Sequence, residues 1–495
     1  MSERNWINVF LLREFTSYLN SDELINLSMS QRTIRLKLLA VAYSTFNFNS
    51  FIRGRSYKSY LMDKDYDNYD KWANELEDRK YEYMNEMSEY DYDDCGYDED
   101  YYVNREQYCE HFFLINPYKD LSIRFDSSEN AFKSDIKKFQ GHPTKLKISN
   151  IKDYYYLLYK IPGIFGSITT LVVDSSRITY EVFEYLLNNL NGLQNLELTN
   201  STLIIYNQNS NSYFINWPLS LKKLKFSDNE VDFVRDNESP LLLKPNTQLV
   251  LEGESLQISP KHLPNLVSLD YKRHFSADSS YSDDIDKIDD FQSFLQLNSH
   301  IKKLKMRFDH YSSALLKSIE LFSNLEHLDI SKASNTSVHK SELSNLPVLS
   351  NLKCLNLGLI EDPTVFKVIA QKFPNLARLI ARFHFKKLRQ LCYSVSELSN
   401  LKTLNLGLYK QFSNFIEFEF PALDNLESLE IGLGMYEEFE NISWNARFCP
   451  KLRKVKFIRF YDHPLFEKPY LNSQLRNIWS LSYFPTKLTF YKIKK

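Results

Sequence analysis

Two stretches, LKTLNLGLYK at 401–410 and LKCLNLGLIE at 352–361, carry the same apolar pattern 49 residues apart. In both, leucines alternate with small or polar residues after a leading leucine. Alternation with a period of two is typical of a β-strand that buries one face. The pattern therefore predicts two related strands whose intervening residues face outward, namely Thr403, Asn405 and Gly407 in one copy and Cys354, Asn356 and Gly358 in the other.

The phrase L-x-x-L-x-L recurs along most of the chain at intervals that are mostly 24–28 residues. Counted at its second apolar position, it occurs at Leu171, Leu196, Leu224, Leu269, Leu304, Leu328, Leu355, Leu379, Leu404, Leu429 and Val455. Weaker copies are centred on Leu121, Leu146, Leu249 and Leu488. The 49-residue interval is therefore two repeats.

Between the strand phrases lie stretches with apolar residues at i, i+3, i+4 and i+7, which predict helices over 180–190, 313–322, 364–373 and 390–398. A strand and a returning helix in each 25-residue unit resemble leucine-rich repeats of the ribonuclease-inhibitor-like class. The resemblance covers about 120–490 and implies an α/β solenoid with a parallel sheet on its concave side and helices on its convex side. Asn229 stands where the family has an asparagine that satisfies turning backbone groups.

The amino-terminal stretch 5–39 does not follow the repeat and has helical apolar spacing. Its segments FTSYL (15–19), DELINLS (22–28) and RTIR (32–35) resemble an F-box, with Ile7 and Asn8 in place of the family's leucine-proline start. This resemblance implies a small all-α module that binds a Skp-family adaptor of a cullin ubiquitin ligase. The implied adaptor-binding residues are Ile7, Leu11, Phe15, Leu19, Leu24 and Leu27.

Four segments follow from these patterns: an F-box-like module at 1–50, an acidic tyrosine-rich insert at 51–110, leucine-rich repeats at 111–463, and a divergent last repeat with a cap at 464–495. An F-box followed by leucine-rich repeats implies a substrate-recognition adaptor of a Skp-cullin-F-box ligase that binds an unknown protein target. The alternative is a protein-interaction scaffold without a ligase link, whose first helices only cap the solenoid.

The charges are unevenly distributed. Residues 62–104 contain sixteen Asp and Glu against four Lys and Arg, together with nine tyrosines, so the remainder of the chain has a net charge of +10 within the total of −2. This insert is either a solvated, partly helical loop, or a segment that folds over the basic part of the same chain, or a phosphorylation-tuned latch on the concave surface.

If the apolar positions of each strand are buried, the intervening positions line the concave face. The basic residues at those positions, which form the predicted target-binding set, are Lys223, Lys225, Lys303, Lys305, Arg307, Arg378, Arg382, Lys454 and Lys456. They either keep the sheet soluble or bind acidic or phosphorylated stretches of a partner, for which Arg378 and Arg382 suit bidentate contacts. Intervening acids and the lack of stacking aromatic residues disfavour nucleic acid as the partner.

No catalytic, cofactor-binding or metal-binding motif occurs in the sequence. Eleven glycines and the absence of a phosphate-binding loop disfavour nucleotide binding, and the ten histidines are scattered. Five cysteines without a paired spacing disfavour a disulfide framework or a zinc site. No stretch approaches the length of a membrane span, and no signal peptide is recognisable, so we expect a non-enzymatic protein of the cytoplasm or nucleus with no cofactor and no membrane partner.

Overall fold

The structure is a computed structural model of the 495-residue chain. It describes residues 43–53, 129–151, 155–206, 214–234, 254–273, 288–309, 311–333, 336–384, 394–409, 416–419, 423–433, 442–445, 449–459, 478–484 and 487–493. The chain divides into two compact units, Met1–Gly192 with Glu238–Gln248, and Leu193–Asn237 with Leu249–Lys495. Each unit is described by itself.

The first unit contains three parallel strands, β1 (Thr45–Asn47), β2 (Lys145–Ser149) and β3 (Thr170–Asp174). Leu146 pairs with Phe46 on one side and with Leu171 on the other, and all three side chains are buried. The sheet of this unit thus includes a strand from within the segment 1–50, which was assigned to the F-box-like module. Because β1 and β3 are the two neighbours of β2, the phrase around Leu121 does not supply the adjacent strand; Leu121 itself lies outside the described residues.

Helices accompany the strands of this unit and bury aromatic and aliphatic side chains. Helix α5 (Phe48–Arg53) directly follows β1, and the ring of Phe48 packs against Phe132 of a helix at 129–136, with 5.9 Å between ring centroids. Helix α10 (Tyr180–Asn189) confirms the helix predicted over 180–190, and the hydroxyl of Thr179 caps its first turn by accepting a hydrogen bond from the Val182 amide at 3.4 Å.

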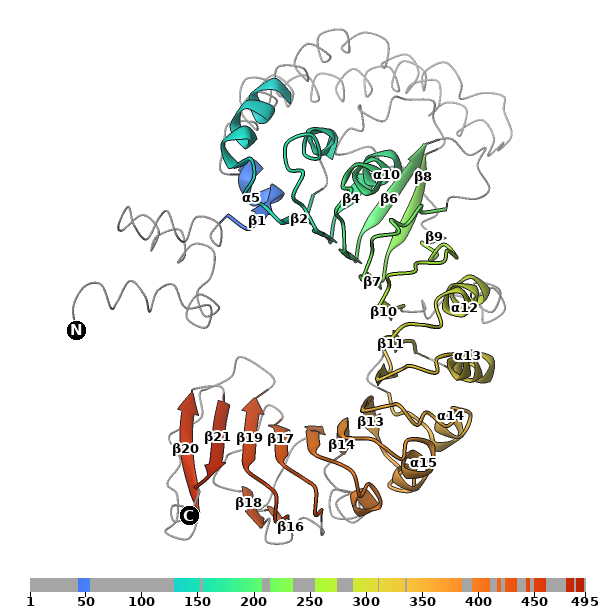
Figure 1. The fold of residues 1–495 in the computed structure, drawn as a ribbon, viewed down its shortest axis with the longest axis vertical. Helices are drawn as coiled ribbons and strands as arrows, with labels where there is room; N and C mark the ends of the chain where they lie inside the picture. The colour runs from blue at the N-terminus through green and yellow to red at the C-terminus, as the bar shows by residue number, and fades with distance from the viewer. Residues whose placement is uncertain are drawn as a thin grey trace, which may run out of the picture. The chain divides into compact units, whose positions relative to one another are not determined.

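The second unit is built on one sheet of parallel strands (Figure 1). In spatial order these are β5 (Asn195–Thr199), β7 (Lys223–Ser227), β10 (Ser268–Lys272), β11 (Lys303–Arg307), β12 (His327–Asp329), β13 (Cys354–Ile360), β14 (Arg378–His384), β15 (Thr403–Tyr409), β17 (Ser428–Leu433) and β19 (Lys454–Arg459). The central apolar residue of each repeat pairs with that of the next strand, and each is 0–1% exposed. The predicted repeat is confirmed from Leu196 to Val455 at every position except Leu249.

One predicted repeat strand is wrong. Leu224 of β7 pairs directly with Leu269 of β10, so no strand centred on Leu249 lies between them. The intervening chain instead contributes β8 (Glu230–Val234) and β9 (Glu254–Ser255), which form a smaller sheet with β6 (Thr202–Tyr206). Two predicted repeats are therefore one long repeat, and Leu249 lies outside the described residues.

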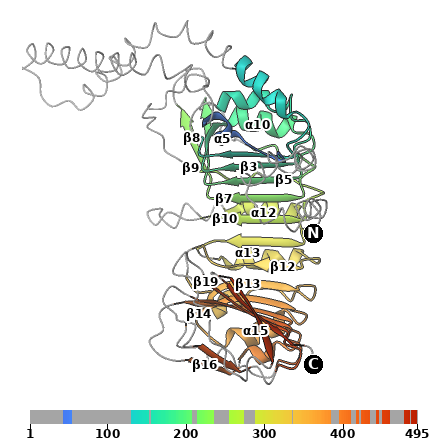
Figure 2. The same cartoon turned by 90° about the vertical axis from the view of Figure 1, so that its left-hand side faces the viewer.

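The segments that return from one strand to the next differ along the second unit. After β5 and β7 the chain forms β6 and β8, whereas later returns contain α12 (Ile288–Leu297), α13 (Ser313–Ser318), α14 (Lys340–Ser344) and α15 (Val365–Lys372). Helices α13 and α15 confirm the predictions over 313–322 and 364–373. Within 390–398, residues 390–393 lie outside the described part and Val395–Glu397 form a 3-10 turn. In this unit the helices cover one side of the sheet, and we call the other side the open face (Figure 2).

An antiparallel hairpin follows the last parallel strand. Strand β21 (Lys487–Lys492) pairs antiparallel with β19 and with β20 (Trp479–Phe484). The prediction of a repeat centred on Leu488 is wrong, because only two residues separate β20 from β21 and so short a connection reverses the chain. Phe490 of β21 packs on Phe457 with 5.9 Å between ring centroids.

Asn229 confirms the role expected at its place in the repeat. Its side chain is 3% exposed, its Nδ2 donates to the Leu198 carbonyl at 2.9 Å, and its Oδ1 accepts from the Ser201 amide at 3.2 Å. The preceding Asp228 has φ +50, in the left-handed region that Asn and Asp tolerate. The turn after β7 is thus stabilised by a buried amide that satisfies backbone groups of the previous repeat.

Candidate functional site on the open face

The open face carries three rows of side chains that run across the strands. Within each strand the residues alternate, as in β11, where Leu304 and Met306 are buried while Lys303, Lys305 and Arg307 are not. The parallel register then aligns equivalent positions of neighbouring strands.

The first row consists of Asn195, Lys223, Ser268, Lys303, His327, Cys354, Arg378, Thr403, Ser428 and Lys454. The middle row consists of Glu197, Lys225, Asp270, Lys305, Asp329, Asn356, Ile380, Asn405, Glu430 and Lys456. The third row consists of Thr199, Ser227, Lys272, Arg307, Leu359, Arg382, Gly407, Gly432 and Ile458. All nine predicted target-binding residues lie in these rows.

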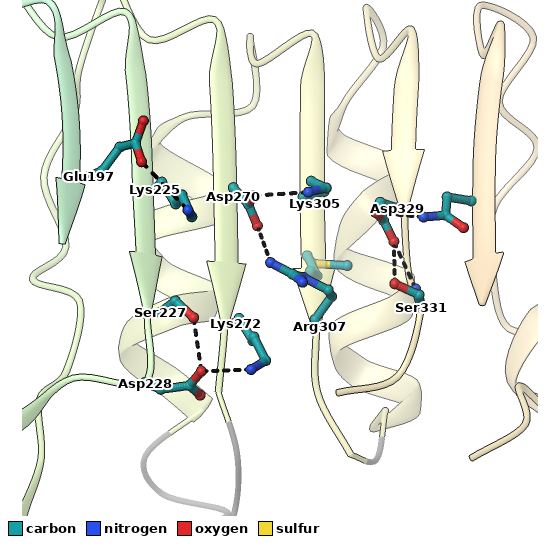
Figure 3. Close-up of polar contacts among 12 residues, drawn as sticks. Glu197, Lys225, Ser227, Asp228, Asp270, Lys272, Lys305, Arg307, Asp329 and Ser331 are labelled. Carbon is teal, nitrogen blue, oxygen red and sulfur yellow. Dashed lines mark hydrogen bonds and ion pairs between the residues drawn. The ribbon is translucent and has the colours of Figure 1, made fainter. Parts of the chain in front are cut away.

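In the middle row, bases pair with acids from neighbouring strands (Figure 3). Lys225 Nζ lies 3.5 Å from a Glu197 carboxylate oxygen, and Asp270 contacts Lys305 Nζ at 3.0 Å and Arg307 Nη2 at 3.2 Å. Each of these acids belongs to the strand next to that of its base. Three of the predicted target-binding residues are therefore already engaged with carboxylates of the protein.

The same arrangement recurs near the end of the sheet. Lys456 Nζ lies 2.7 Å from Glu430 Oε2, and Asn405 Nδ2 donates to Glu430 Oε1 at 3.4 Å. The charge of Lys456 is thus balanced within the sheet, as are those of the bases near Asp270.

Asp329, at the centre of the middle row, is held by the protein. Its side chain is buried, with 7% exposed. Its Oδ1 accepts from the Ser331 amide at 3.0 Å and the Ser331 hydroxyl at 2.7 Å, and its Oδ2 accepts from Asn356 Nδ2 at 2.8 Å (Figure 3). A carboxylate with three donors supports the turn after β12 and leaves little accepting capacity for a partner.

The first row contains no carboxylate. Lys223, Lys303 and Arg378 are exposed, and within the described part of the chain none of these three forms an ion pair. Lys454 lies over the ring of Tyr491, with its Nζ 5.9 Å from the ring centroid. The first row is therefore a line of cations separated by neutral side chains.

His327 and Cys354 occupy the middle of the first row. Burial lowers the pKa of His327 from its usual 6.5, and the positive charges of Lys303, Arg378 and Lys353 lower it further against the opposing effect of Glu326. Burial likewise raises the pKa of the Cys354 thiol, so that it is protonated at neutral pH. These two groups are uncharged there, and an unactivated thiol is a poor nucleophile.

The sequence pattern predicts no site at His327, because the ten histidines are scattered along the chain. Its position one residue before the central leucine of HLD (327–329) would have placed it on the open face, since that position faces outward in every repeat of this sheet. Its neighbours in the row, Lys303 and Cys354, lie on β11 and β13. The order of the repeats already places these two strands on either side of β12.

One outward-facing prediction is wrong. Gly358 has φ +67, and a Cβ there would lie 2.9 Å from the Cβ of Ser331. The register shifts between Asn356 and Leu359, so that Leu359 takes the third-row position opposite Arg382. An extra residue in β13 forms a bulge and turns Gly358 toward the neighbouring repeat. Gly407 of β15 remains in register, opposite Arg382.

Several predicted features lie outside the described residues, including the whole proposed adaptor-binding set and the acidic stretch 62–104. Within the described residues, no group of three or more His, Cys, Asp or Glu side chains could hold a metal ion. Among the helices that the structure describes, none combines the length and apolar character that crossing a bilayer requires.

Comparison with known proteins gives partial similarities, and no family model matches the chain. CD180 antigen of Mus musculus is 26% identical over 188 residues, which are 37% of this chain and 27% of that protein. A leucine-rich-repeat protein of Leptospira interrogans is 14% identical, covering 65% of this chain and 74% of its own, with a TM-score of 0.30. An internalin of Listeria monocytogenes is 12% identical, covering 68% and 94%, with a TM-score of 0.24.

Proposed function

We propose that this leucine-rich-repeat protein is a non-catalytic recognition subunit that binds a target protein along the open face of its sheet. Leucine-rich-repeat proteins act in protein–protein interaction, because stacked repeats present an extended surface to a partner. The observation that carries the proposal is the first row, a line of exposed cations on the side of the sheet that the helices leave uncovered.

The chemistry of the described residues supports binding rather than catalysis. A catalytic thiol needs a base or cation that stabilises its thiolate, yet the pKa of Cys354 is raised despite the nearby Arg378. The carboxylates of the middle row are engaged in ion pairs and turn hydrogen bonds, with no pair of acids left to share protons with a substrate. The face is thus suited to charge-complementary recognition.

Site-specific photo-crosslinking tests where the target binds. A photoreactive residue at Ser268 or Thr403 in the first row should capture one and the same protein in the native cell. The matched positions Glu320 and Gln371, which are exposed on the helix-covered side, should not capture it. Equal capture of the same protein from both sides of the sheet would reject the open face as the binding surface.

We further propose that the amino-terminal segment 5–39 links the chain to a cullin ligase through a Skp-family adaptor. The support is the F-box-like sequence together with its place in the chain, ending a few residues before β1 begins at Thr45. Within the described residues β1 is paired on one side only, by β2, so a solenoid cap remains the competing role for the segment.

Co-purification distinguishes these two roles. We expect the intact chain to retain a Skp-family adaptor, and the double variant Phe15→Asp, Leu19→Asp to lose it while still folding, as judged by circular dichroism. If the segment is only a cap, the intact chain will retain no such adaptor and the double variant will unfold at a lower temperature.

A further inference from the structure

Resting on the proposed function, we propose that the first row binds an extended acidic segment of the target, whose Asp or Glu side chains are spaced to match the cations of successive strands. The exposed positive charges indicate that the partner is acidic, and the order of the strands indicates how far apart its acids lie. These two steps, charge and spacing, rest on different observations.

The charge step rests on where carboxylates fall on the open face. Lys303 and Arg378 are exposed, and two acids, Glu326 and Glu427, directly precede a first-row residue. Of these, Glu326 is engaged with Lys353 at 3.3 Å. Asp329 of the middle row already accepts three hydrogen bonds from Ser331 and Asn356. Among the described residues, no carboxylate forms an ion pair with Lys223, Lys303 or Arg378, and an acidic partner would supply one.

The spacing step rests on strand order. Lys303 and Arg378 are separated by β12 and β13, which makes three strand spacings, or about 14 Å at about 4.8 Å each. An extended peptide rises about 3.3 Å per residue, so acids about four residues apart reach both cations. Between them lie His327 and Cys354, which are uncharged at neutral pH and can face uncharged residues of the peptide.

The same strand-spacing estimate applies to the cations on either side of Lys303 and Arg378. Lys223 lies two strand spacings before Lys303, and Lys454 lies three after Arg378. A peptide that crosses the strands would therefore meet all four cations with acids at about i, i+3, i+7 and i+11.

Nucleic acid fits this row less well than an acidic peptide. The first row contains no Phe, Tyr or Trp side chain on which a base could stack, and the acids Asp270 and Asp329 line the adjacent middle row. A polyanion with a charge at every nucleotide would meet these carboxylates, whereas spaced peptide acids would meet only the cations.

Fluorescence anisotropy with designed peptides tests the inference on the full chain. The probe is a labelled glycine-serine peptide with four aspartates at positions 1, 4, 8 and 12, and its isomer has the four aspartates adjacent. We expect the spaced probe to bind several-fold more tightly than the isomer at low salt. Lys303→Gln and Arg378→Gln should each weaken binding about threefold, the range of an exposed ion pair.

The matched control is Lys367→Gln on the exposed side of α15, which removes the same charge from the helix-covered side and should leave binding of the spaced probe unchanged. Equal affinity for both peptides would overturn the spacing, and equal losses in all three variants would overturn the row. Stronger displacement of the probe by oligothymidylate than by unlabelled peptide would favour nucleic acid instead. Capture of a target by the open face with no binding of either peptide would overturn the acidic segment while leaving the proposed function intact.

Discussion

The first and middle rows cross the same strands and lie two residues apart along each strand, yet their charges are arranged differently. In the middle row Lys225, Lys305 and Lys456 each meet an acid of an adjacent strand, and Asp329 is held by turn donors. In the first row the cations have only neutral neighbours. Balanced charges hold the sheet together, whereas unbalanced ones repel each other and are retained at a small cost in stability. The difference therefore marks the first row as the surface for a partner.

The largest effect is expected from a substitution in the buried core beneath both rows. Leu379 lies between Arg378 and Ile380 in β14 with none of its surface exposed. Leu379→Ala should lower the free energy of unfolding by about 3 kcal/mol, because it leaves a cavity in the core. Urea denaturation measures this, with Arg378→Ala as the surface control that should change stability by about 0.5 kcal/mol or less. Similar losses in both variants would contradict the alternation of buried and open positions.

The bulge beside the middle row comes next. Gly358→Ala should lower the free energy of unfolding by about 2 kcal/mol, since the positive φ is strained for alanine and its Cβ would overlap Ser331. Gly166→Ala is the matched control, because its Cβ would have no neighbour within 4 Å. A Gly358→Ala protein as stable as the control in thermal denaturation would show that the bulge is not required.

Removing an acid from the middle row tests whether bases without an acidic neighbour bind the partner, as proposed for the first row. Asp270→Asn removes the acid that engages Lys305 and Arg307, and both of these bases remain partly exposed. We expect a loss of at most about 1 kcal/mol in stability and a gain of about threefold in affinity for the spaced aspartate peptide. Lys367→Gln provides the reference for unspecific charge effects. Unchanged affinity would mean that Lys305 and Arg307 do not reach the partner.

The smallest expected effect concerns pH. The folded-state pKa of His327 lies below its usual 6.5, so below that pH the unfolded chain binds more protons at this site and stability falls as the pH falls. Binding of the aspartate probe should move in the opposite direction, because an acidic ligand favours the protonated ring. The expected signature is a modest gain in affinity between pH 7 and pH 5.5 that is absent in His327→Gln. The other charged groups facing the ring, Lys303, Glu326, Lys353 and Arg378, are present in both proteins.

Much of this fold could be predicted from local pattern. Alternating leucines marked the strands from Leu196 to Val455, and helical spacing marked α13 and α15. The failures at Leu249 and Leu488 share a cause, since a short apolar phrase does not specify which strand will pair with it. Direct pairing of β7 with β10, and the antiparallel hairpin at β21, depend on the lengths and turns of connecting segments.

The candidate site divides in the same way. The sequence by itself determined which lysines and arginines of the strands lie between the buried positions, because a strand's period of two separates buried leucines from the basic residues between them. Only the tertiary structure decided which of those lysines are balanced: Lys225 meets Glu197 and Lys305 meets Asp270, each acid lying on the adjacent strand. Partners across a parallel sheet lie some 25 residues or more apart in the chain, so register and strand order decide which acid each base meets. They therefore also decide which cations remain for another molecule.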